Sequence, residues 1–136
     1  MAASVLVDAG FIVALLSRRD VHHDWAVAQV GEYPPPWFTC ESVLSEAFHL
    51  LGPRGAPALQ ALLRRDALQP DFDLSEQLEP VLALMSKYSD VPMSVADACL
   101  VRMTETRPDA VVLTTDADFR VYRRHSRQVV PCVTPD

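Results

Sequence analysis

Apolar residues along this chain follow two patterns, which predict short buried strands and amphipathic helices. Residues 4–7, "SVLV", are apolar and β-branched without alternation, so they are typical of a strand that is buried on both faces. Similar short runs predict further strands at residues 37–40, 68–73, 110–114 and 128–133. The run at 68–73 is the weakest, because Pro70 cannot donate a hydrogen bond to a neighbouring strand.

Between these runs, apolar residues recur at the three- to four-residue spacing of helices. The helices predicted from this spacing span residues 9–19, 21–33, 41–52, 56–67, 75–89, 94–107 and 118–125. Asp8 and Ser94 stand at the N-cap positions of two of them, and the three prolines at 34–36 end the second. Strands that are apolar on both faces and alternate with helices predict an α/β fold, in which helices cover both sides of a parallel sheet.

Acidic residues follow two of the predicted strands closely. Asp8 comes after the first strand, and Asp116 and Asp118, in the segment "TTDADF", come after the fourth. The carboxyl ends of parallel strands meet at one edge of a sheet, where the functional crevice of such folds lies. If these two strands are neighbours, their carboxylates come within reach of one metal ion.

Two further acids, Glu46 and Asp97, occupy the apolar stripes of their predicted helices. Glu46 lies three residues after Val43 and four before Leu50, and Asp97 is flanked by alanines and followed by Leu100. We therefore expect both side chains to face inward. A carboxylate in such a place is costly without a compensating charge, and no Lys or Arg is placed locally to provide one. A divalent cation would compensate all these acids together.

Each acid also has a simpler explanation when it is taken alone. Asp8 and Asp116 are suited to capping the helices that follow them. Glu46 and Asp97 could each form an ion pair with an Arg that is distant in the sequence. These alternatives stay open for each residue, but four such acids, two at strand ends and two on inward helix faces, together favour a metal site.

The segments that carry these acids occur in the order "VLVDAGFIVALL", "TCESVLSEAFHLL", "SVADACLVRMTE" and "VLTTDADFRVY". In this order and spacing, the chain resembles the PIN-domain nucleases, and most of all the VapC-type toxin ribonucleases of bacterial toxin–antitoxin pairs. The resemblance covers essentially the whole chain, which we expect to be a single PIN-like domain over residues 1–136. It implies a three-layer α/β/α fold with a five-stranded parallel sheet.

The resemblance also implies a function, a cofactor and partners. The acids that match the family's catalytic cluster are Asp8, Glu46, Asp97 and Asp116, with Asp118 as an auxiliary fifth. The implied ligands of Mg²⁺ or Mn²⁺ are Asp8, Asp97, Asp116 and Asp118, and Glu46 is a further ligand or orients the attacking water. The implied activity is endonucleolytic cleavage of RNA in the cytoplasm, by a homodimer that has a cognate antitoxin protein.

This sequence departs from the family pattern at two places. Members often have Ser or Thr one or two residues after the first Asp, where this chain has Ala9 and Gly10. A ligand-orienting hydroxyl is therefore missing, unless Thr114 or Thr115 supplies one. Close relatives also often have a further acid where Ser94 stands. These gaps concern a second metal ion more than the first.

The net charge of the chain argues against one class of nucleic-acid-binding protein. A net charge of −6 argues against a protein that coats nucleic acid through bulk charge, but not against an enzyme that binds phosphate through metal ions and local arginines. The residues Arg120, Arg123, Arg124 and Arg127 follow helical spacing and predict one basic face beside Asp116. That face either binds RNA phosphates or is a solvated helix end, and both interpretations stay open.

The composition of the chain also indicates the cellular compartment in which we expect the protein. No apolar run approaches the roughly 20 residues of a membrane span. The first ten residues lack the basic region of a signal peptide. The three cysteines are widely spaced and odd in number, which is typical of a reduced, cytosolic protein. We therefore expect a cytoplasmic protein with no membrane partner.

Two other functions fit parts of the sequence. A PIN-like interaction module without catalysis would tolerate the missing hydroxyls at Ala9 and Gly10, whereas the four intact acids argue against it. A phosphatase or phosphotransfer domain would use Asp8 as its nucleophile. A haloacid-dehalogenase-like enzyme would need an acid at position 10, and a receiver domain would need a Lys at a late strand end, but the single Lys is Lys87. We therefore favour the nuclease.

Overall fold

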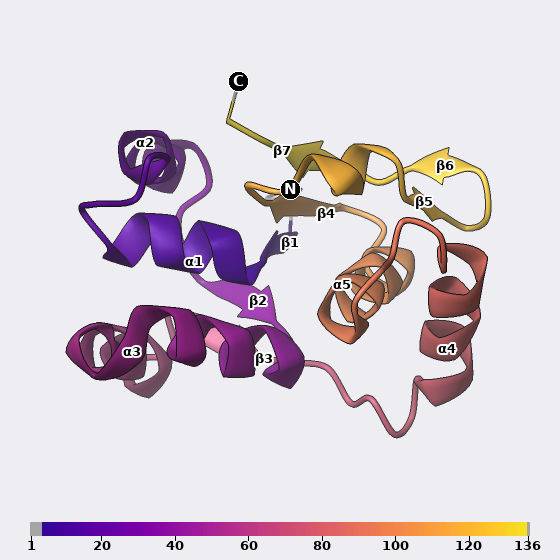
Figure 1. Cartoon of the computed structure of the whole chain (residues 1–136), viewed down its shortest axis with the longest axis horizontal. Helices are drawn as coiled ribbons and strands as arrows, with labels where there is room; N and C mark the ends of the chain where they lie inside the picture. The colour runs from indigo at the N-terminus through magenta and orange to yellow at the C-terminus, as the bar shows by residue number, and fades with distance from the viewer. Residues whose placement is uncertain (1–3, 136) are drawn as a thin grey trace.

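A parallel sheet of five strands runs through the middle of the structure, a computed structural model that describes residues 4–135 (Figure 1). The strands are β1 (Ser4–Val7), β2 (Trp37–Thr39), β3 (Leu68–Pro70), β4 (Ala110–Leu113) and β7 (Cys132–Val133). They lie in the order β3-β2-β1-β4-β7, and every neighbouring pair is parallel. β1 and β4 pair along their whole length. The predicted sheet is therefore confirmed, and its first and fourth strands are neighbours.

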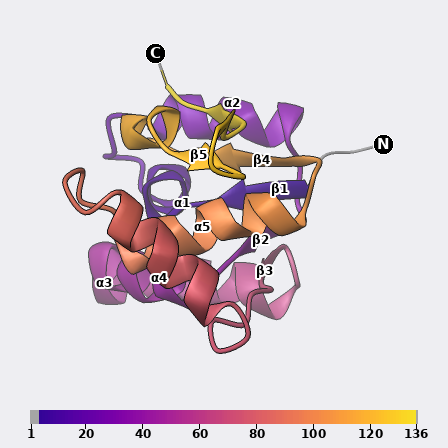
Figure 2. The ribbon, with the colours of Figure 1, turned by 90° about the vertical axis from the view of Figure 1, so that its right-hand side faces the viewer.

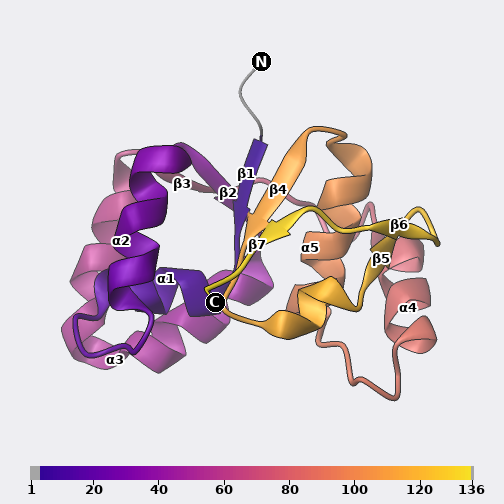
Figure 3. The ribbon, with the colours of Figure 1, turned by 90° about the horizontal axis from the view of Figure 1, so that it is seen from above.

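Helices cover both faces of the sheet and give the predicted three layers. α1 (Ala9–Leu16), α2 (His23–Glu32) and α3 (Glu41–Arg64) pack on one face, and α4 (Leu78–Lys87) and α5 (Val95–Thr106) on the other (Figure 3). Figure 2 shows that α5 lies against the sheet and α4 lies outside α5. None of the helices within residues 4–135 has the length and apolar character needed to cross a membrane.

α3 joins the two helices that were predicted at residues 41–52 and 56–67. Gly52 has a φ of 66° and turns the chain, and the helix resumes at once with Pro53 in its first turn. Glycine adopts this left-handed conformation without the steric cost of a Cβ, and proline is tolerated where a helix begins. The predicted gap between the two helices is therefore reduced to a kink.

The C-terminal part differs most from the prediction. Instead of a helix over residues 118–125, a short 3-10 helix, η1 (Ala117–Arg120), precedes a hairpin of β5 (Arg123–Arg124) and β6 (Gln128–Val129). The hairpin turns at residues 125–126, which have φ values of 49° and 69°. The strand predicted at 128–133 is also split, since its first part pairs with β5 and its last part, β7, pairs with β4.

The helix prediction at 118–125 is wrong because Tyr122 is held in the core. Phe119 and Tyr122 are both fully buried and meet edge to face, and Tyr122 packs against Tyr88 in the same way. The backbone N–H of Arg123 then donates to the Tyr88 hydroxyl at 2.9 Å. These contacts favour a backbone that leaves the helical conformation after η1 and continues into β5.

The interior on the α1 side is aromatic. Phe11 is fully buried and meets Trp25 and Trp37 edge to face, with ring centroids 5.9 and 5.7 Å apart. α1 packs closely against α3, and the buried β1 feeds directly into α1. This packing fixes the position of the residue between β1 and α1, which is Asp8.

Candidate functional site

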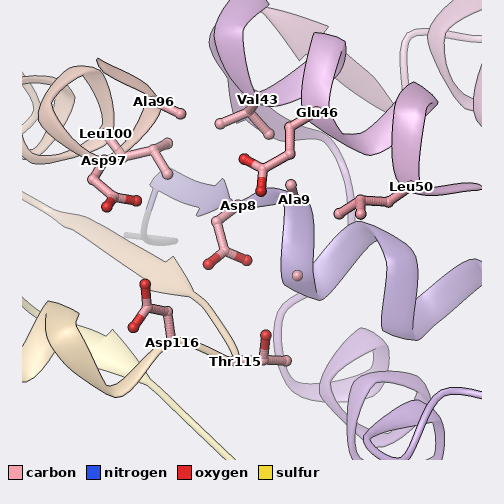
Figure 4. A pocket seen from close by; sticks show the side chains of 11 residues that line it. Asp8, Ala9, Val43, Glu46, Leu50, Ala96, Asp97, Leu100, Thr115 and Asp116 are labelled. Carbon is pink, nitrogen blue, oxygen red and sulfur yellow. The ribbon is translucent and has the colours of Figure 1, made fainter. Parts of the chain in front are cut away.

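A pocket of about 180 Å³ opens at the carboxyl ends of β1 and β4. Four acidic side chains line it, and in Figure 4 they face one space: Asp8, Glu46, Asp97 and Asp116. Asp8 follows β1, Asp116 follows β4, Glu46 is on α3, and Asp97 is in the first turn of α5. The other lining residues are Ala9, Gly10, Val43, Leu50, Ala96, Leu100 and Thr115. The four acids predicted to share a site therefore lie together.

Asp8 is the most buried of the four acids, with 7% of its surface exposed. Its carboxylate caps α1 by accepting from the N–H of Phe11 at 2.8 Å, and it also accepts the hydroxyl of Thr114. Burial raises the pKa of Asp8 to about 7, and the charges of Asp116 and Asp97 add to this, although the two hydrogen bonds oppose it. The capping explanation of Asp8 is thus confirmed, and the structure also places two other acids close enough to affect its pKa.

Asp97 is both a cap and a pocket residue. Ser94 caps α5 by accepting from the N–H of Asp97 at 3.0 Å, and Oδ2 of Asp97 accepts in return from the N–H of Ser94 at 3.3 Å. The Tyr122 hydroxyl donates to the same oxygen at 3.1 Å. Burial raises the pKa of Asp97, and the charge of Asp116 contributes. Asp97 forms no ion pair with an Arg in the described part of the chain, so the alternative of a distant Arg partner is wrong there.

Thr114 links the acids at the two strand ends. Its hydroxyl donates to Asp8 and accepts from the N–H of Asp116 at 2.9 Å. Asp116 in turn accepts from the N–H of Asp118 at 2.9 Å and so caps η1. Asp118 is half-buried but is not among the residues that line the pocket. The strand-end acids therefore form one hydrogen-bonded chain in which Asp118 stands behind Asp116.

The surroundings of Glu46 differ from the prediction. Val43 and Ala47 on the same helical stripe are buried as expected, but Glu46 and Leu50 are exposed. The stripe leaves the core along α3 and borders the pocket instead, as Figure 4 shows. Glu46 therefore reaches the acidic space from the solvent side rather than from the interior.

A hydroxyl stands where the sequence seemed to lack one. A Cβ on Gly10 would lie 2.1 Å from Oγ1 of Thr115, which is closer than real Cβ contacts come. Gly10 therefore makes the room that the Thr115 side chain occupies. Thr115 lines the pocket, and its hydroxyl forms no hydrogen bond with the other residues the structure describes. Thr114 and Thr115 thus supply the two hydroxyls that Ala9 and Gly10 do not.

The arginines predicted to bind RNA do not form one helical face, because their segment is not a helix. The Arg123 guanidinium donates to the carbonyls of residues 120–122, at 2.7 to 3.1 Å. Arg124 donates to the carbonyl of Thr104 at 3.0 Å, and Arg120 donates to a threonine hydroxyl near the C-terminus. Within residues 4–135, no Arg lines the acidic pocket. Arg124 therefore joins the hairpin to α5 and Arg120 bonds to the residue after β7, whereas Arg123 bonds within its own segment.

Sequence reasoning missed one residue that shapes the site, Tyr122. It lies in the segment predicted as a helix with one basic face and was given no role there, whereas its hydroxyl donates to the Asp97 carboxylate. The available signal was the spacing of Phe119 and Tyr122, two large aromatic residues three positions apart beside a run of arginines. Such a pair indicates an inward-facing side, which the charge pattern hid.

The donor set of the pocket suits a hard divalent cation. Its four carboxylates have no Lys, Arg or His beside them among the described lining residues, so no protein cation compensates them there. As the side chains lie, no three His, Cys, Asp or Glu residues in 4–135 are close enough to share one ion. Mg²⁺ nevertheless needs only one or two protein carboxylates, because it keeps several waters and binds substrate phosphate oxygens. The residues present therefore fit such an ion.

Comparisons with known proteins agree with this fold. Residues 5–124 match the sequence profile of the PIN domain. A crystal structure of VapC20 from Mycobacterium tuberculosis, described as a sarcin-ricin loop cleaving toxin, is similar with a TM-score of 0.78. The similarity covers 87% of this chain and 94% of that chain, at 23% sequence identity, and it shows a shared fold. A comparison with curated protein sequences finds no match.

Proposed function

This chain belongs to the PIN domain family, and from that premise we propose that it is a metal-dependent endoribonuclease, the toxin of a toxin–antitoxin pair. The observation that carries the proposal is the pocket in which four carboxylates from four segments meet, with no basic residue among the described residues that line it. The similarity of fold to VapC20, which is described as a sarcin-ricin loop cleaving toxin, supports the same activity. RNA is therefore the proposed substrate.

Mg²⁺ or Mn²⁺ is the proposed cofactor, held by Asp8, Asp97 and Asp116. When bound, such an ion lowers the pKa of a water molecule and neutralises charge on the scissile phosphate. Asp118 supports Asp116 through its N–H, or contributes to a second ion. Burial is the main cause of the raised pKa of Asp8 and of Asp97, and the neighbouring acids add to it; a bound cation would oppose both causes.

The chain's own groups have separate tasks in this proposal. Tyr122 and the capping N–H groups hold the carboxylates in fixed orientations, which favours catalysis because no reorganisation is then needed during the reaction. Glu46 orients the attacking water, since it reaches the pocket from the solvent side. Thr115 donates its free hydroxyl to a phosphate oxygen or to an ordered water.

The test is cleavage of a single-stranded RNA by the purified protein with Mn²⁺, Mg²⁺ or a chelator. Internal cleavage products should form with either metal and disappear with the chelator. Glu46→Gln should lower the rate of cleavage by roughly 100-fold or more, which is the usual contribution of a general acid or base. Glu41→Gln is the matched control, because Glu41 is exposed on the same helix but does not line the pocket, and it should cleave like the wild type.

A PIN-like module that binds a partner without catalysis is the second candidate. The observation in its favour is that no three potential ligands within the described residues stand close together. A calorimetric titration with Mn²⁺ separates the two candidates. The nuclease should bind Mn²⁺ and lose this binding in the Asp97→Asn variant, whereas a module should bind it poorly in both forms.

The proposed assembly is a cytoplasmic homodimer that also binds an antitoxin protein. Apolar side chains remain exposed on α2 and its preceding loop and around the β5–β6 hairpin, at Val21, Val27, Val121 and Val129. These single side chains do not form one patch, so the family resemblance is the ground for proposing a second copy of the chain. Light scattering at micromolar concentration should give twice the mass of the chain, and a monomeric mass would contradict the dimer.

A further inference from the structure

A second pocket, of about 460 Å³, lies between the end of α1 and the kink in α3. Three arginines line it, and we call it the basic pocket: Arg18, Arg19 and Arg54. Its other lining residues are Val13, Leu16, Ser17, Leu50, Leu51 and Gly55. Among the described residues no acid lines it, so its charge is the opposite of that of the acidic pocket.

These three arginines differ from most others in the chain. In the part of the chain that the structure describes, none of them forms an ion pair or donates a side-chain hydrogen bond. Asp20, the acid next to Arg19, accepts instead from the N–H of His22 at 2.8 Å. All three guanidinium groups are therefore available to a ligand, in a protein whose net charge is −6.

The basic pocket begins where the acidic pocket ends. Leu50 lines both, and 56% of its surface is exposed. Figure 4 shows Leu50 on α3, at the edge of the acidic space and facing α1. The kink at Gly52 then turns α3, and Arg54 follows within its next turn. A chain-like ligand in the first pocket would therefore pass over Leu50 into the second.

We propose that the basic pocket binds the phosphates of the RNA strand next to the bond that is cleaved. The proposal rests on the proposed ribonuclease function. Guanidinium forks match phosphate geometry and bind it with two parallel hydrogen bonds. The apolar floor of Val13, Leu16 and Leu51 suits the faces of riboses and bases. An acidic protein segment is the other ligand with this chemistry, but RNA is the ligand that the proposed function assigns to the adjoining pocket.

Binding is tested on the full chain with a fluorescent single-stranded RNA decanucleotide, by anisotropy over a range of salt concentrations, in chelator so that no cleavage occurs. Arg18→Ala/Arg19→Ala should make the slope of log affinity against log salt shallower by about 1.4, and Arg54→Ala by about 0.7, the increments for losing two phosphate contacts and one. Arg64→Ala/Arg65→Ala is the matched control. It removes two adjacent exposed arginines from the far end of α3 and should leave the slope unchanged.

Cleavage kinetics give a second readout. With the decanucleotide, Arg18→Ala/Arg19→Ala should raise KM about tenfold or more and leave kcat within about twofold, since it removes contacts made equally before and during the reaction. With a dinucleotide, which is too short to reach the basic pocket, the variant should match the wild type. Thermal unfolding of each variant checks that it is folded. If a double variant does not fold, the two single Ala variants are measured in its place.

The two proposals fail in different ways. If the wild type cleaves RNA and the Arg18/Arg19 variant behaves like the Arg64/Arg65 control in both assays, the RNA assignment of the basic pocket is wrong and a protein ligand replaces it. If no preparation cleaves RNA but the salt slopes still differ as expected, the nuclease proposal fails and the RNA contact stands.

Discussion

The acidic and basic pockets adjoin at Leu50 but are held in opposite ways. In the acidic pocket, backbone N–H groups and two hydroxyls fix the carboxylates of Asp8 and Asp97. In the basic pocket, the guanidinium groups are exposed and make no such bonds within the described residues. Carboxylates that are held close together repel one another, so they need hydrogen-bond donors that fix them. Guanidinium groups that contact a flexible nucleic acid can instead adjust their positions to it. This difference is the one that the two proposals require, with fixed carboxylates at the reaction centre and mobile arginines along the RNA strand.

The largest effect is expected from Asp97→Asn. It should lower RNA cleavage by orders of magnitude while leaving the metal-free protein at least as stable as the wild type. Removing one charge relieves repulsion from Asp8 and Asp116, and an Asn oxygen can still accept from Tyr122 and Ser94. The rise in melting temperature on adding Mn²⁺ should shrink, because the variant loses much of the binding free energy.

Thermal unfolding of both proteins with and without Mn²⁺ checks this prediction. A purely structural Asp97 would give the reverse pattern. The metal-free variant would then be less stable than the wild type by roughly 1–3 kcal/mol, because the hydrogen bonds from Ser94 and Tyr122 to the carboxylate would be weakened, and its metal-induced shift would be undiminished.

The pH dependence of stability should reveal Asp8. Its pKa is raised from 3.8 to about 7, so between these values the unfolded chain releases a proton that the folded protein keeps. The free energy of unfolding of the metal-free protein should therefore fall as the pH rises from about 4 to about 7, and then level off. The part due to Asp8 is roughly 4 kcal/mol. Urea unfolding at a series of pH values, with Asp8→Asn for comparison, measures it, and parallel curves for the two proteins would rule it out.

Thr115→Val should lower cleavage about tenfold without loss of stability. The variant keeps the shape of the side chain and removes a hydroxyl that is free in the described structure; one lost hydrogen bond to a charged group accounts for about 1.5 kcal/mol. Thr115→Ser should restore most of the activity. If valine and serine act alike, the hydroxyl has no part in the reaction. Rates with RNA in Mn²⁺ decide between these outcomes.

The smallest effect is expected at the boundary between the pockets. Leu50→Glu should raise KM for RNA a few-fold and Leu50→Lys should lower it by a similar factor, because one exposed charge a few ångströms from a phosphate changes the energy by about 1 kcal/mol. Leu50 is mostly exposed, so both variants should fold with stabilities close to each other. Equal KM values for the two variants would show that RNA does not cross this boundary.

Local rules in the sequence were enough to predict most of the fold and the acids. Asp8 and Asp116 each follow a predicted strand, and a parallel sheet predicts that they lie close together if those strands are neighbours, as β1 and β4 are. Glu46 was misplaced because a helical stripe looks the same whether it faces a core or the edge of a pocket. The basic helical face was predicted wrongly because the regular spacing in "RVYRR" suggested a helix, whereas the segment is a 3-10 turn and a hairpin in which Arg123 and Arg124 donate to backbone carbonyls.

The basic pocket had no signal in the sequence. Arg18 and Arg19 follow α1, Arg54 is in α3, and only the packing of these two helices brings them together. The hairpin was hidden for a related reason. His125 and Ser126 adopt positive φ without being glycine, because the burial of Tyr122 outweighs the local preference.

The contact between Gly10 and Thr115 couples two positions that are far apart in the sequence. A Cβ at position 10 would lie 2.1 Å from Oγ1 of Thr115, so a larger residue there requires the Thr115 side chain to rotate away or position 115 to change as well. The effects of substitutions at the two positions should therefore not add, because residues in contact share their energetic cost.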